Sequence, residues 1–90
     1  MGALFNAVIP GFHKEVADAD VDFMDGNEPT GAKKVVGVRI NDITTGAICS
    51  LDMAGVAVAY DGCVVGEVLV GNFTSLNAAG TVDSVIVLYV

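Results

Sequence analysis

Residues 47–65 read AICSLDMAGVAVAYDGCVV, and this stretch decides the fold class. Apolar residues alternate with other residues along it, which is the pattern of strands with one buried face. The apolar positions are odd-numbered from Cys49 to Met53 and even-numbered from Val56 to Tyr60. A change of parity needs a bulge or a bend, and glycine tolerates either because it has no Cβ. We therefore predict a bend at Gly55 that carries the chain around a barrel or between two sheets.

Asp61-Gly62 follows directly, between Tyr60 and the run Cys63-Val64-Val65. A two-residue type I′ turn requires positive φ at both central positions, and Asp-Gly is a favoured pair for that turn. The sequence therefore predicts a β-hairpin whose turn is Asp61-Gly62.

Further strands are expected on both sides of this stretch. Runs rich in Val, Ile and Leu cover 34–40, 67–70 and 81–90, with turn signals between them about every eight to twelve residues. The turn residues that end the first run are Asn41, Asp42 and Gly46. This spacing is typical of an all-β sandwich or barrel. We predict an all-β fold, a small β-barrel or sandwich.

The last run is apolar on both of its faces. Val85 and Val87 alternate with Ile86 and Leu88 up to Val90. A strand of this kind is buried on both sides. We therefore expect the interior of the domain to cover one face and a neighbouring subunit or surface to cover the other.

The first 32 residues differ in composition from the rest. They hold six of the eleven acidic residues and both prolines. We predict an N-terminal arm and acidic segment over 1–32, followed by a β domain over 33–90. Phe12, Val16 and Phe23 could lie on one stripe of a helix, but an extended or irregular segment fits equally well, and both remain open.

Net charge excludes one class of partner. The chain has four basic and eleven acidic residues, a net charge of −7, so its surface repels the phosphate backbone of DNA or RNA. We expect no direct nucleic-acid ligand. We also expect no membrane span, because no apolar run reaches eighteen residues. A 90-residue domain rich in Val and Ala buries a modest core, so oligomerisation or docking is a natural source of further stability.

The residues that could carry chemistry are few. His13 is the only histidine, and the motifs GxSxG and HExxH are absent. Clustered carboxylates invite a calcium interpretation, but with Asp18 as the first loop position Phe23 replaces the required glycine and Pro29 the required glutamate. We interpret the cluster as a solvated acidic surface; its members are Asp18, Asp20, Asp22 and Asp25. We expect a protein that is not an enzyme, with no catalytic residues, no metal and no cofactor.

Cys49 and Cys63 have neither the CxxC spacing of redox sites nor enough companions for a zinc site. We interpret both as small buried side chains in a protein made in a reducing cytoplasm. A disulfide between neighbouring strands remains the alternative.

Residues 36–59, VGVRINDITTGAICSLDMAGVAVA, resemble the core repeat of small capsid decoration proteins of tailed phages, also called head-stabilising or cement proteins. The shared pattern is a short apolar strand that starts Gly-Val, an Asn-Asp turn, a glycine, and an alternating strand around Gly-Val. It is carried here by Gly37, Val38, Asn41, Asp42, Gly46 and Gly55-Val56. Residues 78–90, AAGTVDSVIVLYV, are similar to the final turn and strand of such domains. The likeness covers about half of the chain, and the region between Gly62 and Gly80 is shorter than in typical members.

The resemblance implies a structural role in a virion. Decoration proteins are usually trimers at local threefold positions on the capsid exterior, so a homotrimer bound to the major capsid protein is expected, assembled in the host cytoplasm. The resemblance also implies that the N-terminal arm reaches across capsid subunits, where it could add an edge strand to a capsid sheet. The expected capsid-binding residues of the arm are Ala3, Leu4, Phe5, Val8 and Ile9.

Two other functions remain open. The chain could be a subunit of a different shell or tail assembly, such as a microcompartment vertex or a tail-tube component. A small ligand-binding barrel or an enzyme would require a pocket with convergent polar groups.

Overall fold

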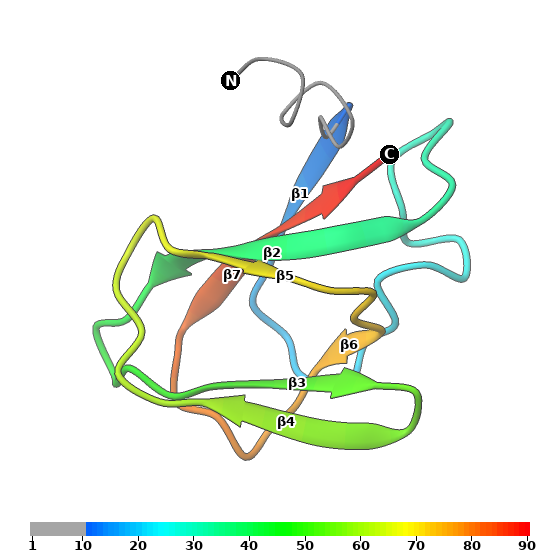
Figure 1. Cartoon of the computed structure of the whole chain (residues 1–90). Coiled ribbons are helices and arrows are strands. Elements are labelled where there is room, and N and C mark those ends of the chain that lie inside the picture. Colours follow the sequence, from blue (N-terminus) through cyan, green and yellow to red (C-terminus); the bar gives the residue numbers. More distant parts are fainter. Residues whose placement is uncertain (1–10) are drawn as a thin grey trace.

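The structure of the chain, a computed structural model that describes residues 11–90, contains seven strands in two antiparallel sheets (Figure 1). The strands are β1 (Phe12–Val16), β2 (Val35–Asp42), β3 (Cys49–Met53), β4 (Val56–Tyr60), β5 (Val68–Val70), β6 (Ser75–Leu76) and β7 (Ser84–Tyr89). The described residues form no helix. The prediction of an all-β fold is therefore confirmed, and residues 1–10 of the predicted arm and acidic segment lie outside the described residues.

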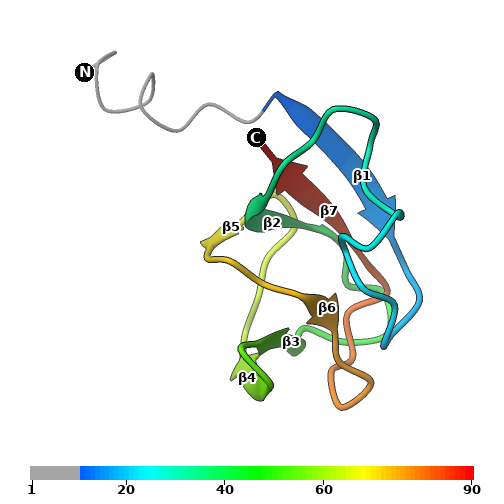
Figure 2. The same ribbon diagram turned by 90° about the vertical axis from the view of Figure 1, so that its right-hand side faces the viewer.

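The strand order is β1-β7-β2-β5 in the four-stranded sheet and β4-β3-β6 in the three-stranded sheet. The two sheets face each other across the core (Figure 2). The edge strands β4 and β5 lie on the same side of the molecule, but no pairing joins them. A closed barrel was one of the two predicted architectures, and it is wrong because β4 and β5 do not pair.

β7 is the central strand of the larger sheet and pairs with both β1 and β2. Its inward side chains are fully buried, among them Val85, Val87 and Tyr89. Its outward side chains Ile86 and Leu88 are half-buried. One face of the apolar strand β7 thus lies in the core, and the described residues cover its other face only in part.

The hairpin lies seven residues before the predicted position. Met53 pairs with Val56, and the two residues between them have positive φ, 53° at Ala54 and 80° at Gly55. This is the backbone of a type I′ turn, so the feature predicted as a bend at Gly55 reverses the chain completely.

The prediction of a hairpin at Asp61-Gly62 is wrong. Gly62 has a positive φ of 67°, but Asp61 is not among the residues with positive φ, so the pair cannot form a type I′ turn. The chain instead leaves the three-stranded sheet after Tyr60 and enters β5, which pairs with β2.

The N-terminal residues of the described chain belong to the same compact unit. β1 is an extended strand paired with β7, so the helical alternative for Phe12 to Val16 is wrong. Further on, Phe23 is 1% exposed, and its N–H donates to the carbonyl of Thr74 at 2.8 Å. The compact unit therefore includes residues that the sequence analysis assigned to the arm and acidic segment.

Both sheets and their connections contribute to the core. Its buried apolar residues are Phe23, Val35, Val38, Ile40, Cys49, Leu51, Cys63, Leu69, Phe73, Leu76, Val85, Val87 and Tyr89. Most of these side chains are short and aliphatic, and the aromatic rings of Phe23, Phe73 and Tyr89 are the largest side chains that are fully buried.

The hairpin turn offers a test of the fold. Ala54 has left-handed backbone, which costs a residue with a Cβ about 1 kcal/mol, whereas asparagine tolerates it. Ala54→Asn should therefore raise the free energy of unfolding by up to about 1 kcal/mol, and the β-branched Ala54→Val should lower it. Urea unfolding followed by circular dichroism measures both. A destabilising Ala54→Asn would contradict the turn assignment.

Candidate interaction surface

The outward face of the four-stranded sheet carries a group of apolar side chains that residues 11–90 leave exposed or only half-buried. Two rows cross it in register: Val68, Arg39, Ile86 and Glu15 in the first, and Val70, Gly37, Leu88 and His13 in the second. Val70 is 79% exposed and Val68 is 47% exposed. Side chains of this size standing together on a surface mark a candidate contact site. We call these two rows, with Val36 beside them, the outward face.

β5 is held against β2 at unusually short range. A Cβ on Gly37 would lie 2.7 Å from the carbonyl oxygen of Leu69, so any larger residue at this position would push β5 away. The glycine thereby fixes where Val70 stands. The N–H of Gly71 also donates to the carbonyl of Val36 at 3.0 Å, which extends the contact beyond the strand.

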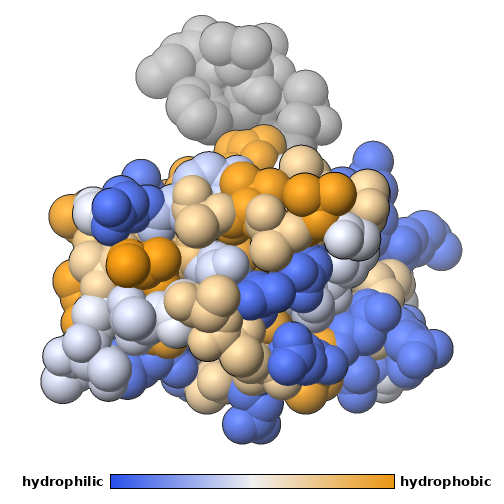
Figure 3. Space-filling view, turned by 90° about the horizontal axis from the view of Figure 1, so that it is seen from below, coloured by the Kyte–Doolittle hydropathy of each residue, from blue (hydrophilic) through white to orange (hydrophobic). Residues whose placement is uncertain are grey.

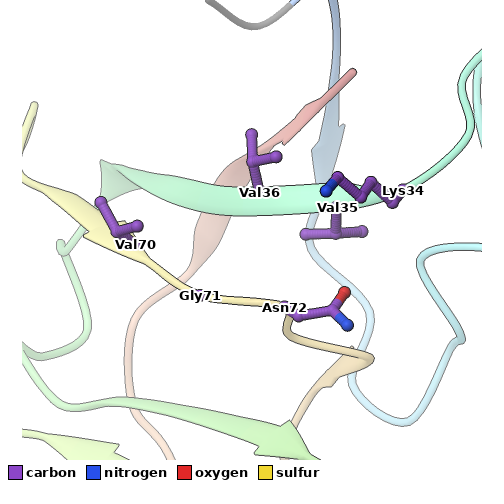
Figure 4. A pocket seen from close by; sticks show the side chains of 6 residues that line it. All are labelled: Lys34, Val35, Val36, Val70, Gly71 and Asn72. Atoms are coloured by element: carbon purple, nitrogen blue, oxygen red, sulfur yellow. The ribbon is translucent and has the colours of Figure 1, made fainter. Parts of the chain in front are cut away.

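A hollow of about 270 Å³ opens where β2 begins and β5 ends (Figure 4). Its lining residues are Lys34, Val35, Val36, Val70, Gly71 and Asn72. Val35 and Val36 point to opposite sides of β2 in this view. The hollow is smaller than the roughly 300–1,000 Å³ of typical small-molecule sites and brings few polar groups together. It suits one or two apolar side chains of a partner better than a cofactor.

Positive charge is confined to this sheet and the residues that lead into it. The four basic residues are Lys14 on β1, Lys33 and Lys34 directly before β2, and Arg39 on β2. The Nζ of Lys14 donates to the carbonyl of Asn27 at 2.6 Å. Arg39 is exposed among the valines of the outward face. A chain with net charge −7 thus places a cation in the middle of its apolar surface.

Gly11, the first described residue, lies at a corner of the domain beside this surface. The N–H of Gly11 donates to the carbonyl of Tyr89 at 2.9 Å, and the N–H of Lys33 donates to the carbonyl of Val90 at 2.7 Å. This corner therefore holds the starts of β1 and β2 and the end of β7 (Figure 1). The predicted capsid-binding residues all lie outside the described residues; they are Ala3, Leu4, Phe5, Val8 and Ile9.

The predicted turn residues have structural roles. The Nδ2 of Asn41, inside β2, donates to Ser84 Oγ at 2.8 Å and to Glu15 Oε2 at 3.1 Å, so it ties three strands together. The Oδ1 of Asp42 accepts hydrogen bonds from the hydroxyl and N–H of Thr44, which lowers the pKa of Asp42.

Gly46 and Gly62 serve the connections between the strands. A Cβ on Gly46 would lie 2.5 Å from Thr81 Oγ1, so this loop passes directly against the one before β7. Gly62 provides positive φ, and the carboxylate of Asp61 accepts its N–H at 3.0 Å. None of the predicted turn residues converges with another on an open pocket of the described chain.

The potentially reactive groups are dispersed or buried. His13 is exposed on the outward face. No group of three or more His, Cys, Asp or Glu residues that could hold a metal ion occurs within 11–90. The same part of the chain has no helix long and apolar enough to cross a membrane.

Cys49 and Cys63 are both buried free thiols. Burial, with smaller contributions from the neighbouring Cys63 and Glu67, raises the pKa of Cys49 from its ordinary 9.0 to about 12. Burial also raises the pKa of Cys63. Because the thiolate is the reactive form, both side chains are protected from thiol chemistry at neutral pH.

Comparison of the chain with protein-family models, curated proteins and solved structures found no match. The likeness to decoration proteins therefore rests on the sequence motifs alone.

The buried thiol predicts how stability depends on pH. The folded state keeps Cys49 protonated up to about pH 12, whereas the unfolded chain releases this proton near pH 9. Stability should therefore be complete below pH 9 and fall as the pH rises above it. Urea unfolding at pH 7, 9 and 10.5 measures this loss, and Cys49→Ala should make it smaller. An unchanged pH dependence in Cys49→Ala would contradict the assignment.

Proposed function

We propose that the chain is a non-enzymatic decoration protein that binds the outer surface of a phage capsid and stabilises the shell. The observation that carries the proposal is the outward face, where exposed Val68 and Val70 lie beside Arg39, near the corner at which the described chain begins with Gly11. A protein that works by adhesion needs such a surface and needs no reaction centre. The decoration-type sequence pattern of residues 36–59 supports the same role.

The proposed contact has two parts that act together. The outward face lies against the capsid protein, and burial of a valine side chain there contributes about 1.5 kcal/mol or more. The apolar residues of the arm add a strand to a capsid sheet, where backbone hydrogen bonds provide affinity. In a homotrimer three such contacts act at once, so weak single contacts give tight attachment.

A subunit of another shell or tail assembly is the second candidate. The free edges of β4 and β5 favour it, because unpaired strands are a common means of joining subunits. Analytical ultracentrifugation of the purified chain separates the two. Trimers that add to preformed capsids support the decoration role, and rings or shells that form without a capsid support the alternative.

Deletion of Met1 to Ile9 tests the arm. The β domain begins its pairing at Gly11 and Phe12, so the shortened chain should keep its circular dichroism spectrum and its unfolding transition. It should lose co-sedimentation with purified capsids, because the added strand is gone. Undiminished binding by the shortened chain would overturn the role of the arm.

Val70→Asp tests the outward face. The side chain is 79% exposed, so the substitution should leave folding almost unchanged and weaken capsid binding about tenfold or more, since it places a charge in an apolar contact. The matched control is Val21→Asp, which changes a valine that is 40% exposed in the acidic segment. Equal loss of binding in both variants would show a general charge effect and contradict a contact through this face.

A further inference from the structure

β4 is a free edge strand without the devices that usually protect one. Its sequence is VAVAY, with no charged residue, no proline and no bulge in its pairing with β3. Val56 is 62% exposed, and Ala57 and Ala59 are exposed. Native proteins normally cover such an edge or place charges on it, because it is ready to pair with another strand.

The register shows which backbone groups are available. Met53 and Val56 close a two-residue turn and form a hydrogen-bonded pair, so the next pair, Asp52 with Ala57, is not hydrogen-bonded. The opposite side of β3 agrees, since the carbonyl of Asp52 accepts the N–H of Thr74 in the direction of β6. By the same alternation the N–H and C=O groups of Ala57 and Ala59 point away from the sheet.

The other strand edges of the chain are less accessible or shorter. At the edge strand β1, the ring of Phe12 lies 3.3 Å from where a Cβ of Gly31 would be, and Lys14 binds the carbonyl of Asn27. The segment that follows β1 therefore flanks this edge. β5 has only three residues. β4 is the longest open edge within the described residues.

The charged residues directly beside β4, in its strand pairing and in the sequence, are acidic. After Arg39 the chain has five acidic residues and no basic one. Asp52 pairs with Ala57 across the sheet, and Asp61 directly follows the strand. In Figure 3, which views the molecule from below Figure 1, apolar residues cross the upper middle of the surface and hydrophilic residues gather at its right side.

We propose that the free edge of β4 binds an extended segment of another protein that alternates apolar residues with lysine or arginine. The backbone of this segment pairs with Ala57 and Ala59. Its apolar side chains continue the inward row of Val56, Val58 and Tyr60, while its basic side chains lie over the two alanines and reach Asp52. This site is separate from the outward face, and it holds whether or not the decoration role is correct.

The size of Ala57 makes this recognition specific. A residue opposite Ala57 on an added strand lies about 10 Å, two strand spacings, from Asp52. A lysine or arginine side chain spans most of that distance, and the methyl group of alanine leaves the path open. The carboxylate of Asp52 is held in place by Ser75 Oγ at 2.7 Å and Asn77 Nδ2 at 3.0 Å.

A second copy of the chain lacks the required chemistry. Its β4 carries no cation that could reach Asp52. The first ten residues carry no charged side chain either. The favoured occupant is therefore a basic, extended segment of a different protein.

The probe is a blocked nine-residue peptide, TVKVKVKVT, and its control is TVEVEVEVT. Titration into the full chain at low salt, followed by amide NMR and hydrogen exchange, should show binding of the lysine peptide at least about tenfold tighter than binding of the glutamate peptide. The amides of Ala57 and Ala59 should gain protection from exchange. Equal binding of both peptides, or no binding, would overturn the proposal.

Two variants locate the contact. Ala57→Pro removes an N–H that the fold does not use, so it should abolish peptide binding, whereas Ala57→Thr keeps the N–H and should bind. Asp52→Asn removes the charge and should reduce the preference for the lysine peptide about threefold or more, which provides the test if Ala57→Pro does not fold. A peptide preference unchanged in Asp52→Asn would overturn the charge recognition.

Hydrogen exchange of the chain without peptide tests whether a second copy occupies the edge. If no second copy of the chain pairs with β4, the amides of Ala57 and Ala59 should exchange fast in the absence of peptide. Slow exchange of both amides in the absence of peptide, together with an oligomer that Ala57→Pro dissociates, would show that a second copy occupies the edge and would overturn the proposal.

Discussion

The buried hydrogen bond from the hydroxyl of Tyr89 to the carbonyl of Phe23, 2.7 Å long, determines which side of this small domain is closed. Tyr89 ends the central strand β7, and Phe23 lies in the middle of the acidic segment. A tyrosine hydroxyl in a core needs a partner, and the partner here is backbone. The bond therefore ties the acidic segment to the apolar interior, together with the hydrogen bond from the Phe23 N–H to the carbonyl of Thr74.

Within residues 11–90 the opposite side has no equivalent closure, and both proposed contact surfaces follow from that difference. The acidic segment continues the smaller sheet through the bridge between Asp22 and Ser75, so its β6 side is covered. On the side of β4 and β5 only the connections between the sheets cross (Figure 2). The free edge of β4 and the exposed valines of β5 are thus consequences of one asymmetry in the packing.

The all-β class could be predicted because alternation of apolar residues is local information, but the position of the hairpin could not. The change of parity between Met53 and Val56 has two structural meanings. A two-residue hairpin pairs residues of opposite parity, as Leu51 and Val58 do, so it produces the same pattern as a bulge or a bend. Asp61-Gly62 is a more favourable pair for a type I′ turn than Ala54-Gly55. The segment after Asp61-Gly62 nevertheless joins the other sheet, because β5 pairs with β2.

The candidate surface could be predicted only in part. The apolar pattern of Ile86 and Leu88 indicates a second face to cover, and these side chains are half-buried. Its other members come from β2 and β5, which the sequence separates from β7 and which only the strand order brings beside it. The acidic surroundings of β4 are visible in the sequence as the absence of lysine and arginine after Arg39. This absence indicates a preference for a basic partner only once β4 is known to be an edge strand.

The acidic residues beside β4 attract a basic partner more strongly than they repel a second copy, because the charges are closer together in the first case. If two β4 strands paired, their Asp52 carboxylates would be about three strand spacings, or roughly 14 Å, apart, well beyond the screening length of about 8 Å at physiological salt. Repulsion at that range is weak. A lysine side chain that lies over Ala57 extends most of the way to the same carboxylate, so its attraction is stronger than that repulsion. The edge therefore discriminates mainly by what a basic partner gains, and the small side chains at 57 and 59 are the feature that permits that gain.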